Sequence, residues 1–168
     1  LLEAAYQSMA TLASDRRFMG SSNIGATGVL HTWGRDMAYH PHVHFIVPGG
    51  AISKAGDQWL PSRTNYFVCV LALSKIFRAK FKDMMQQCGL LSQIDGAVWQ
   101  QEWVVDSQAV GDGRQSLRYL APYVFRVAIG NHRISRVEVK ADGTGKVTFM
   151  VKPGKQRSYR PMTVTAEE

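Results

Sequence analysis

Cysteine is scarce in this sequence, and long apolar runs are missing. The two cysteines, Cys69 and Cys88, form no CxxC pair and stand among apolar residues. This usage is typical of reduced core thiols in a cytosolic protein rather than of a disulfide framework. No apolar run reaches the roughly 18 residues of a membrane-spanning helix, and no signal peptide is visible. We therefore expect a cytoplasmic protein with no membrane partner.

The sequence also lacks internal repeats and low-complexity segments, and its 168 residues fit one domain, 1–168. Hydrophobic residues make up 45%, which is enough to build a core. The formal net charge of +7 favours a polyanionic partner, with nucleic acid first, although it also fits an ordinary solvated surface. The chain opens at Leu1 as if inside a helix and stops at Glu168 without a turn signal. We therefore expect a fragment of a longer protein.

Hydrophobic periodicity predicts an α+β domain with a mainly antiparallel sheet flanked by helices. Gly89 is a suitable terminator for the second helix, and Asp112 is a candidate N-cap for the third. The predicted helices cover residues 1–18, 72–87 and 116–125. The predicted strands are 26–33 and 42–47, antiparallel to each other, then 103–108 and a hairpin of 132–140 with 146–152, with a short extended run at 66–70.

Four of the five histidines lie within fourteen residues, and this cluster predicts a metal site. His42 and His44 share one face of a strand, roughly 6–7 Å apart along it, because side chains alternate between faces. His31 lies on the preceding strand and is our first choice as third ligand, and His40, beyond Pro41, is the substitute. Imidazole suits Zn, Mn, Fe, Ni or Cu. The alternative is a polar hairpin whose histidines are merely exposed.

Two tyrosines, Tyr119 and Tyr123, stand four residues apart, so a helix would present both hydroxyls on one face. Arg118 and Arg126 are close enough in sequence to contact phosphate oxygens. A tyrosine with a pKa near 10 is a poor nucleophile at neutral pH, and a metal that polarises the target phosphate can compensate. The alternative is a pair of tyrosines packed between helix and sheet.

These segments together resemble the two-tyrosine HUH transposases of rolling-circle insertion sequences, within the HUH endonuclease superfamily. The His-hydrophobic-His element is His42-Val43-His44, preceded by the string 30–34 and followed by Val47-Pro48-Gly49-Gly50. The tyrosine motif of the family resembles the stretch from Tyr119 to Asn131, and the stretch 73–81 is also similar. The resemblance covers nearly the whole chain, with the motifs in the order of the family.

The resemblance implies a HUH/Rep-like nuclease fold in which the histidines bind Mg²⁺ or Mn²⁺. It implies that Tyr119 attacks single-stranded DNA first, leaving a 5′-phosphotyrosine and a free 3′-hydroxyl, and that Tyr123 is the second nucleophile. It also implies a bacterial, DNA-associated protein that acts on element ends and target DNA. An N-terminal zinc-binding region and a C-terminal extension are expected outside this stretch. Pro122 departs from the resembling pattern, and proline inside a helix can kink it and turn Tyr123 away from Tyr119.

Basic residues on the predicted helices and hairpin are candidates for contacts with the DNA backbone. Trp33 and Trp59 are candidates for base stacking, with burial in the core as the alternative. A plasmid replication initiator or relaxase of the same superfamily would share the chemistry. A non-catalytic nucleic-acid-binding fragment and a zinc hydrolase that uses water are the remaining alternatives. The candidate backbone contacts are Lys75, Arg78, Lys80, Lys82, Arg118, Arg126 and Arg133.

Overall fold

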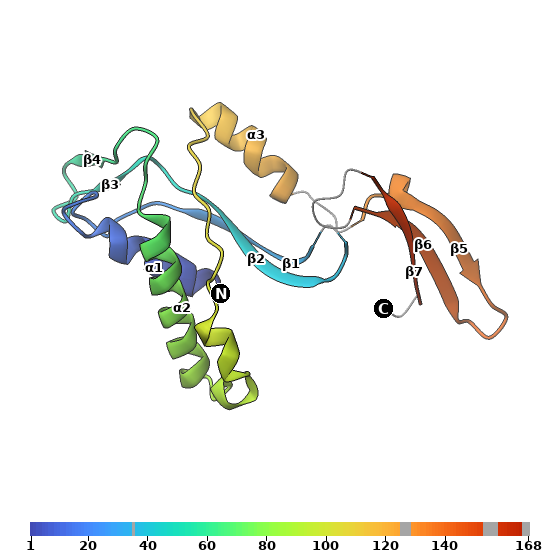
Figure 1. Cartoon of the computed structure of the whole chain (residues 1–168). Helices are drawn as coiled ribbons and strands as arrows, with labels where there is room; N and C mark the ends of the chain where they lie inside the picture. Colours follow the sequence, from blue (N-terminus) through green and yellow to red (C-terminus); the bar gives the residue numbers. More distant parts are fainter. Residues whose placement is uncertain (35, 125–128, 153–157, 166–168) are drawn as a thin grey trace. The chain divides into compact units, whose positions relative to one another are not determined.

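The computed structural model describes residues 1–34, 36–124, 129–152 and 158–165 (Figure 1). The chain forms two compact units, one of Leu1–Leu30 with Val43–Tyr123 and the other of His31–His42 with Val124–Glu168. Within the described residues, no helix combines the length and the apolar character that crossing a membrane requires. The prediction of one domain over 1–168 stays a prediction.

The structure confirms the α+β class with antiparallel pairing, although the strands of the described part form three separate sheets rather than one. Sheet partners are β1 with β2, β3 with β4, and β5–β6–β7 in that order. The strands are β1 (Thr27–Trp33), β2 (Tyr39–Ile46), β3 (Gly50–Ile52), β4 (Trp59–Pro61), β5 (Ile134–Val139), β6 (Gly145–Val151) and β7 (Arg160–Thr165). The helices are α1 (Leu2–Ala13), α2 (Val70–Gln87) and α3 (Gly113–Val124), with 3₁₀ turns η1 (Leu91–Gln93), η2 (Gly96–Gln100) and η3 (Asn131–Arg133).

The core of the first unit forms where α1 packs on α2 (Figure 1). Met9 and Leu12 of α1 meet Leu73 of α2, and Val68 joins them just before α2 begins. These side chains are less than a tenth exposed, so each apolar contact removes surface from water. The spacing of Met9 and Leu12 is the helical stripe that the sequence predicts.

The first helix is shorter than predicted, because it ends at Ala13 and not near Phe18. Asp15 explains the early end, since its carboxylate accepts hydrogen bonds from both the backbone and the side chain of Arg17. Such local bonds compete with helical ones. Hydrogen bonding from the Arg17 side chain is also the main reason why the pKa of Asp15 falls to about 2. Gly20 then reverses the chain with a positive φ of 74°.

The second helix ends as the sequence predicts. Gly89 adopts a φ of +70°, and its amide donates to the carbonyl of Gln86 while the amide of Leu90 donates to that of Met85 at 2.9 Å. This pair of bonds is a Schellman motif, which supplies hydrogen bonds to carbonyls of the last turn that have no partner within the helix. The helix begins at Val70, two residues before the predicted start.

The segment 103–108 was predicted as a strand, and this prediction is wrong for the described structure, in which the segment has no strand assignment. Its local pattern is that of a strand, with Val104 96% exposed and Val105 packed against the core. A strand also needs a neighbouring strand to pair with, whereas here side chains of α2 hold the backbone of this region by hydrogen bonds. The Ser74 hydroxyl donates to the Trp103 carbonyl, and Arg78 donates to the Gln101 carbonyl at 2.6 Å.

The strands β3 and β4 form a short hairpin that the sequence reading missed. Three residue pairs define it, from Gly50 opposite Pro61 to Ile52 opposite Trp59. The buried Ser21 hydroxyl donates to the carbonyl of Ile52 and ties the hairpin to the loop after α1. The run 66–70, predicted as extended, contains only an isolated bridge at Tyr66 before α2 begins.

The predicted hairpin of the second unit is confirmed as β5 and β6, and β7 adds a third strand that was not predicted. Cross-strand partners share a face, so Val137, Val147 and Val164 lie on one side, together with Phe149 and Met162. The opposite side carries a hydrogen bond between the hydroxyls of two threonines, Thr148 and Thr163, at 2.8 Å.

Candidate metal centre

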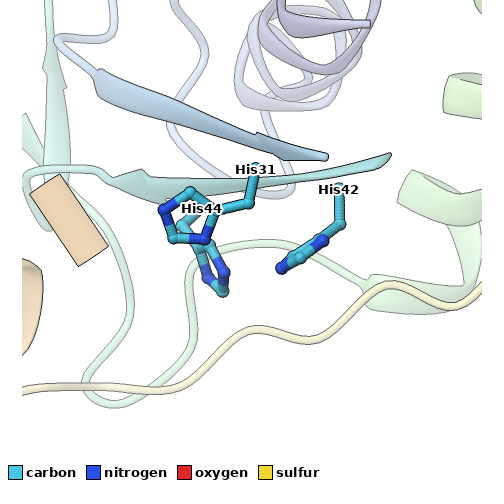
Figure 2. A group of neighbouring side chains, drawn as sticks. All are labelled: His31, His42 and His44. Atoms are coloured by element: carbon cyan, nitrogen blue, oxygen red, sulfur yellow. The ribbon is translucent and has the colours of Figure 1, made fainter. Parts of the chain in front are cut away.

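Three histidines come together on the strand pair β1–β2 (Figure 2). His31 belongs to β1, and His42 and His44 belong to β2. Figure 2 shows all three imidazole rings on the same side of the strand pair. The alternation of β2 places Val43 on the other face, as the sequence predicts.

The three rings offer nitrogen atoms that all lie within 4.8 Å of one another. Two nitrogens bonded to one ion at about 2.2 Å can stand no more than about 4.4 Å apart. A modest inward rotation of the rings therefore completes a site for one ion. His31 is 3% exposed, so one ligand of this set is held inside the protein. The group could hold a divalent metal.

A hydrogen bond from His42 fixes which of its nitrogens can bind a metal. Nδ1 of His42 lies 2.7 Å from the backbone carbonyl of His40. A carbonyl can only accept, so Nδ1 carries the proton and the lone pair of the neutral ring is on Nε2. Metal-binding histidines usually donate their second nitrogen to an oxygen in this way. The chemistry of this donor set therefore fits a metal ion.

The ring of His40 lies beside the three-histidine group and is not part of it. Its centroid is 5.2 Å from that of His42, at an interplanar angle of 42°. The group of three histidines whose nitrogens lie close together contains His31, our first choice as third ligand, and does not contain the substitute His40. The backbone of His40, rather than its ring, contributes to the site.

Trp33 stacks on His31, with ring centroids 5.0 Å apart and an interplanar angle of 21°. Sequence reasoning offered Trp33 as a base-stacking residue and missed its contact with a candidate ligand. The i, i+2 spacing on one strand was the available signal, because such residues share a face. Trp59, the other candidate, is 47% exposed and covers the backbone of Gly50, where an added Cβ would meet its indole ring.

The tyrosine motif lies on α3, which begins at Gly113, three residues before the predicted start, and directly after the predicted N-cap Asp112. The Asp112 carboxylate accepts hydrogen bonds from the amides of Arg114 at 3.1 Å and Gln115 at 3.0 Å, the N-cap arrangement. The helix assignment continues across Pro122 to Val124. The side chains of Tyr119 and Tyr123 lie outside the described part of the structure. The end predicted at Phe125 also lies outside it.

The predicted DNA-contacting cations differ in their surroundings. Arg78 donates to a backbone carbonyl, and the ammonium of Lys82 lies 5.9 Å from the centre of the Trp99 ring. Arg133 donates to the carbonyl of Met150 at 2.7 Å. These three cations therefore make internal contacts. Arg126 lies outside the described residues. Among the others, Lys75, Lys82 and Arg118 are exposed, and Lys80 is half-buried.

A family model for Y2 transposases, described as "Putative transposase", matches residues 25–168. The chain therefore belongs to this transposase family. The chain is also 32% identical over 193 aligned positions to "Putative transposase y4qJ" of Sinorhizobium fredii. That alignment covers 100% of this chain and 46% of the relative, so the chain spans about half of the relative's length. No solved structure matches the chain.

Proposed function

We propose that this transposase-family chain nicks and rejoins single-stranded DNA through a 5′-phosphotyrosine intermediate in rolling-circle transposition. The observation that carries the proposal is the three-histidine group on β1 and β2, whose nitrogens lie within 4.8 Å of one another. The family match and the tyrosine pair on α3 add to it. His31, His42 and His44 would hold Mg²⁺ or Mn²⁺, and such an ion, when bound, polarises a non-bridging phosphate oxygen.

In the proposed reaction, the Tyr119 hydroxyl forms a bond to the phosphorus while the bond from phosphorus to the 3′-oxygen breaks. The phenolic proton is lost from Tyr119 and the released 3′-oxygen gains one, so the products are a 5′-phosphotyrosine and a free 3′-hydroxyl. Tyr123 is the second nucleophile and attacks the recipient strand or resolves the intermediate. Fixed placement of the nucleophile matters because reacting atoms must meet about 3–3.5 Å apart.

The experiment is a covalent-adduct assay with single-stranded oligonucleotides that span both ends of the element encoding the chain. The protein is incubated with each oligonucleotide and Mn²⁺, and denaturing gels reveal any protein–DNA band. Wild type should give the band. Tyr119→Phe should abolish it, because this change removes only the hydroxyl, whereas Tyr123→Phe should keep a first cleavage and lose complete strand transfer.

Each other outcome of the assay points to a different mechanism. Loss of the band in Tyr123→Phe with retention in Tyr119→Phe would reverse the two roles. DNA cleavage by the double variant would exclude a tyrosine nucleophile and favour water. Binding of DNA without any cleavage by wild type would favour a nucleic-acid-binding fragment. Thermal denaturation of every variant serves as the folding control.

A further inference from the structure

A groove of about 1030 Å³ lies within the first compact unit, and the proposed chemistry does not use it. Its volume is at the upper end of the ~300–1,000 Å³ that small-molecule pockets occupy, so it has room for a polymer segment. Its walls come from the end of β2, from the turn between β4 and α2, and from the chain that leads into α3. The lining residues fall in 46–49, 62–67 and 107–114, with Thr27 and Leu117.

The groove borders both elements that carry the proposed chemistry. Ile46, which lines it, follows His44 by two residues on β2. Leu117, which also lines it, precedes Tyr119 by two residues on α3, a rise of about 3 Å along the helix. The groove therefore lies within two residues along the chain of both His44 and Tyr119.

The charges of the groove suit a polyanion. Arg63 and Arg114 both line it. Asp112 is the acidic residue among the lining residues, and its carboxylate accepts from the backbone amides at the start of α3. Arg114 stands in the first turn of α3, where the helix dipole disfavours a cation. An anion in the groove would offset that cost.

Apolar and hydrogen-bonding side chains complete the lining. Leu117 is 68% exposed and Val110 is half-buried, so the groove offers apolar contact for the faces of bases. Thr64, Asn65 and Gln108 offer polar groups along the same surface. Grooves that bind single-stranded nucleic acid combine cations along the backbone with aromatic side chains on which bases stack, and Tyr66 and Phe67 are the aromatic residues of this lining.

We propose that this groove binds the stretch of single-stranded DNA next to the scissile phosphate, with Arg63 and Arg114 on backbone phosphates and Leu117 against a base. The proposal rests on the proposed function for its substrate and adds the path of the strand. Arg63 is already held at the surface, since its guanidinium donates to the carbonyl of Arg17 at 3.3 Å.

The first test is the salt dependence of binding by Arg63→Gln/Arg114→Gln. Fluorescence anisotropy with a labelled oligonucleotide gives the slope of log affinity against log salt, which is about 0.7 per phosphate contact on a single strand. The double variant should make this slope shallower by about 1.4, because it removes two phosphate contacts. The control Lys54→Gln/Lys140→Gln removes two exposed charges that do not line the groove, and it should leave the slope unchanged. Equal losses in both variants would overturn the proposal.

The second test is photo-crosslinking at single positions in the full chain. Replacing Leu117 with p-benzoylphenylalanine should give a crosslink to the oligonucleotide, which truncation of one flank abolishes. The same replacement at Leu71, which is 74% exposed and does not line the groove, should give none. Both sites are exposed, so folding is little affected. No crosslink at Leu117, or equal crosslinks at both sites, would overturn the proposal.

The two proposals can fail separately. If wild type forms the covalent adduct but the groove variants match their controls, the tyrosine chemistry stands and the groove proposal is lost. If Leu117 crosslinks to DNA and the salt slope falls, yet no adduct forms, the groove proposal stands and the proposed chemistry is lost.

Discussion

Removal of the His31 imidazole should abolish the stabilisation that a divalent ion gives to the folded chain. An ion that binds only the folded state stabilises it by about 2.7 kcal/mol at a hundred times its Kd. Each kcal/mol raises the Tm of a chain of ~150–250 residues by roughly 2–4 °C. Wild type with saturating Mn²⁺ should therefore melt about 5–11 °C higher than after EDTA treatment.

Circular dichroism melting curves with and without Mn²⁺ measure this shift within each variant, so the effect of a substitution on the metal-free fold cancels. His31→Ala, His42→Ala and His44→Ala should each lose the shift, because each removes one nitrogen of the group. His40→Ala is the matched control, since it removes a neighbouring ring and keeps the carbonyl that accepts from His42. A full shift in His31→Ala, or its loss in His40→Ala, would refute the ligand assignment.

Two further predictions concern the frame around the site. Gly28→Ala should lower the free energy of unfolding by about 1–3 kcal/mol, because an added Cβ would lie 2.5 Å from Cε1 of Phe45. Urea denaturation measures this, with Gly96→Ala as the control that meets nothing within 4 Å, and equal effects would contradict the packing argument. The carboxyl of Asp15 should titrate near pH 2 in NMR and closer to 3.8 in Arg17→Gln, since hydrogen bonds from Arg17 lower its pKa. Its stabilising contribution is present above its unfolded pKa and is lost as pH falls through about 2, and an unshifted midpoint in Arg17→Gln would argue against this cause.

The features that the sequence predicted well are those fixed by neighbours along the chain. The shared face of His42 and His44 follows from strand alternation alone. The hairpin between β5 and β6 follows from its turn, where the Asp142 carboxylate accepts from both the amide and the hydroxyl of Thr144. The end of α2 follows from the conformational freedom of Gly89.

The features that were missed depend on partners far away in the sequence. β3 contains three residues, and its hairpin is tied to Ser21, which lies 31 residues before Ile52. β7 is defined by its pairing with β6, from Val151 opposite Arg160 to Lys146 opposite Thr165. Local periodicity carries no information about such pairing. The same limit explains the error at 103–108, where a strand-like pattern lacks a strand partner.

The donor set itself ranks the metals that the site can take. Among the residues that the structure describes, the group contains three imidazole nitrogens and no carboxylate. Mg²⁺ prefers oxygen ligands and gives up its water reluctantly, so it should bind least tightly. Mn²⁺ stands below Zn²⁺ in the usual affinity order for divalent ions. With either Mn²⁺ or Zn²⁺, three protein ligands leave a coordination position for a phosphate oxygen. Traces of Zn²⁺ would therefore outcompete Mn²⁺ in a purified sample, and only protein stripped with EDTA can reveal which ion supports cleavage.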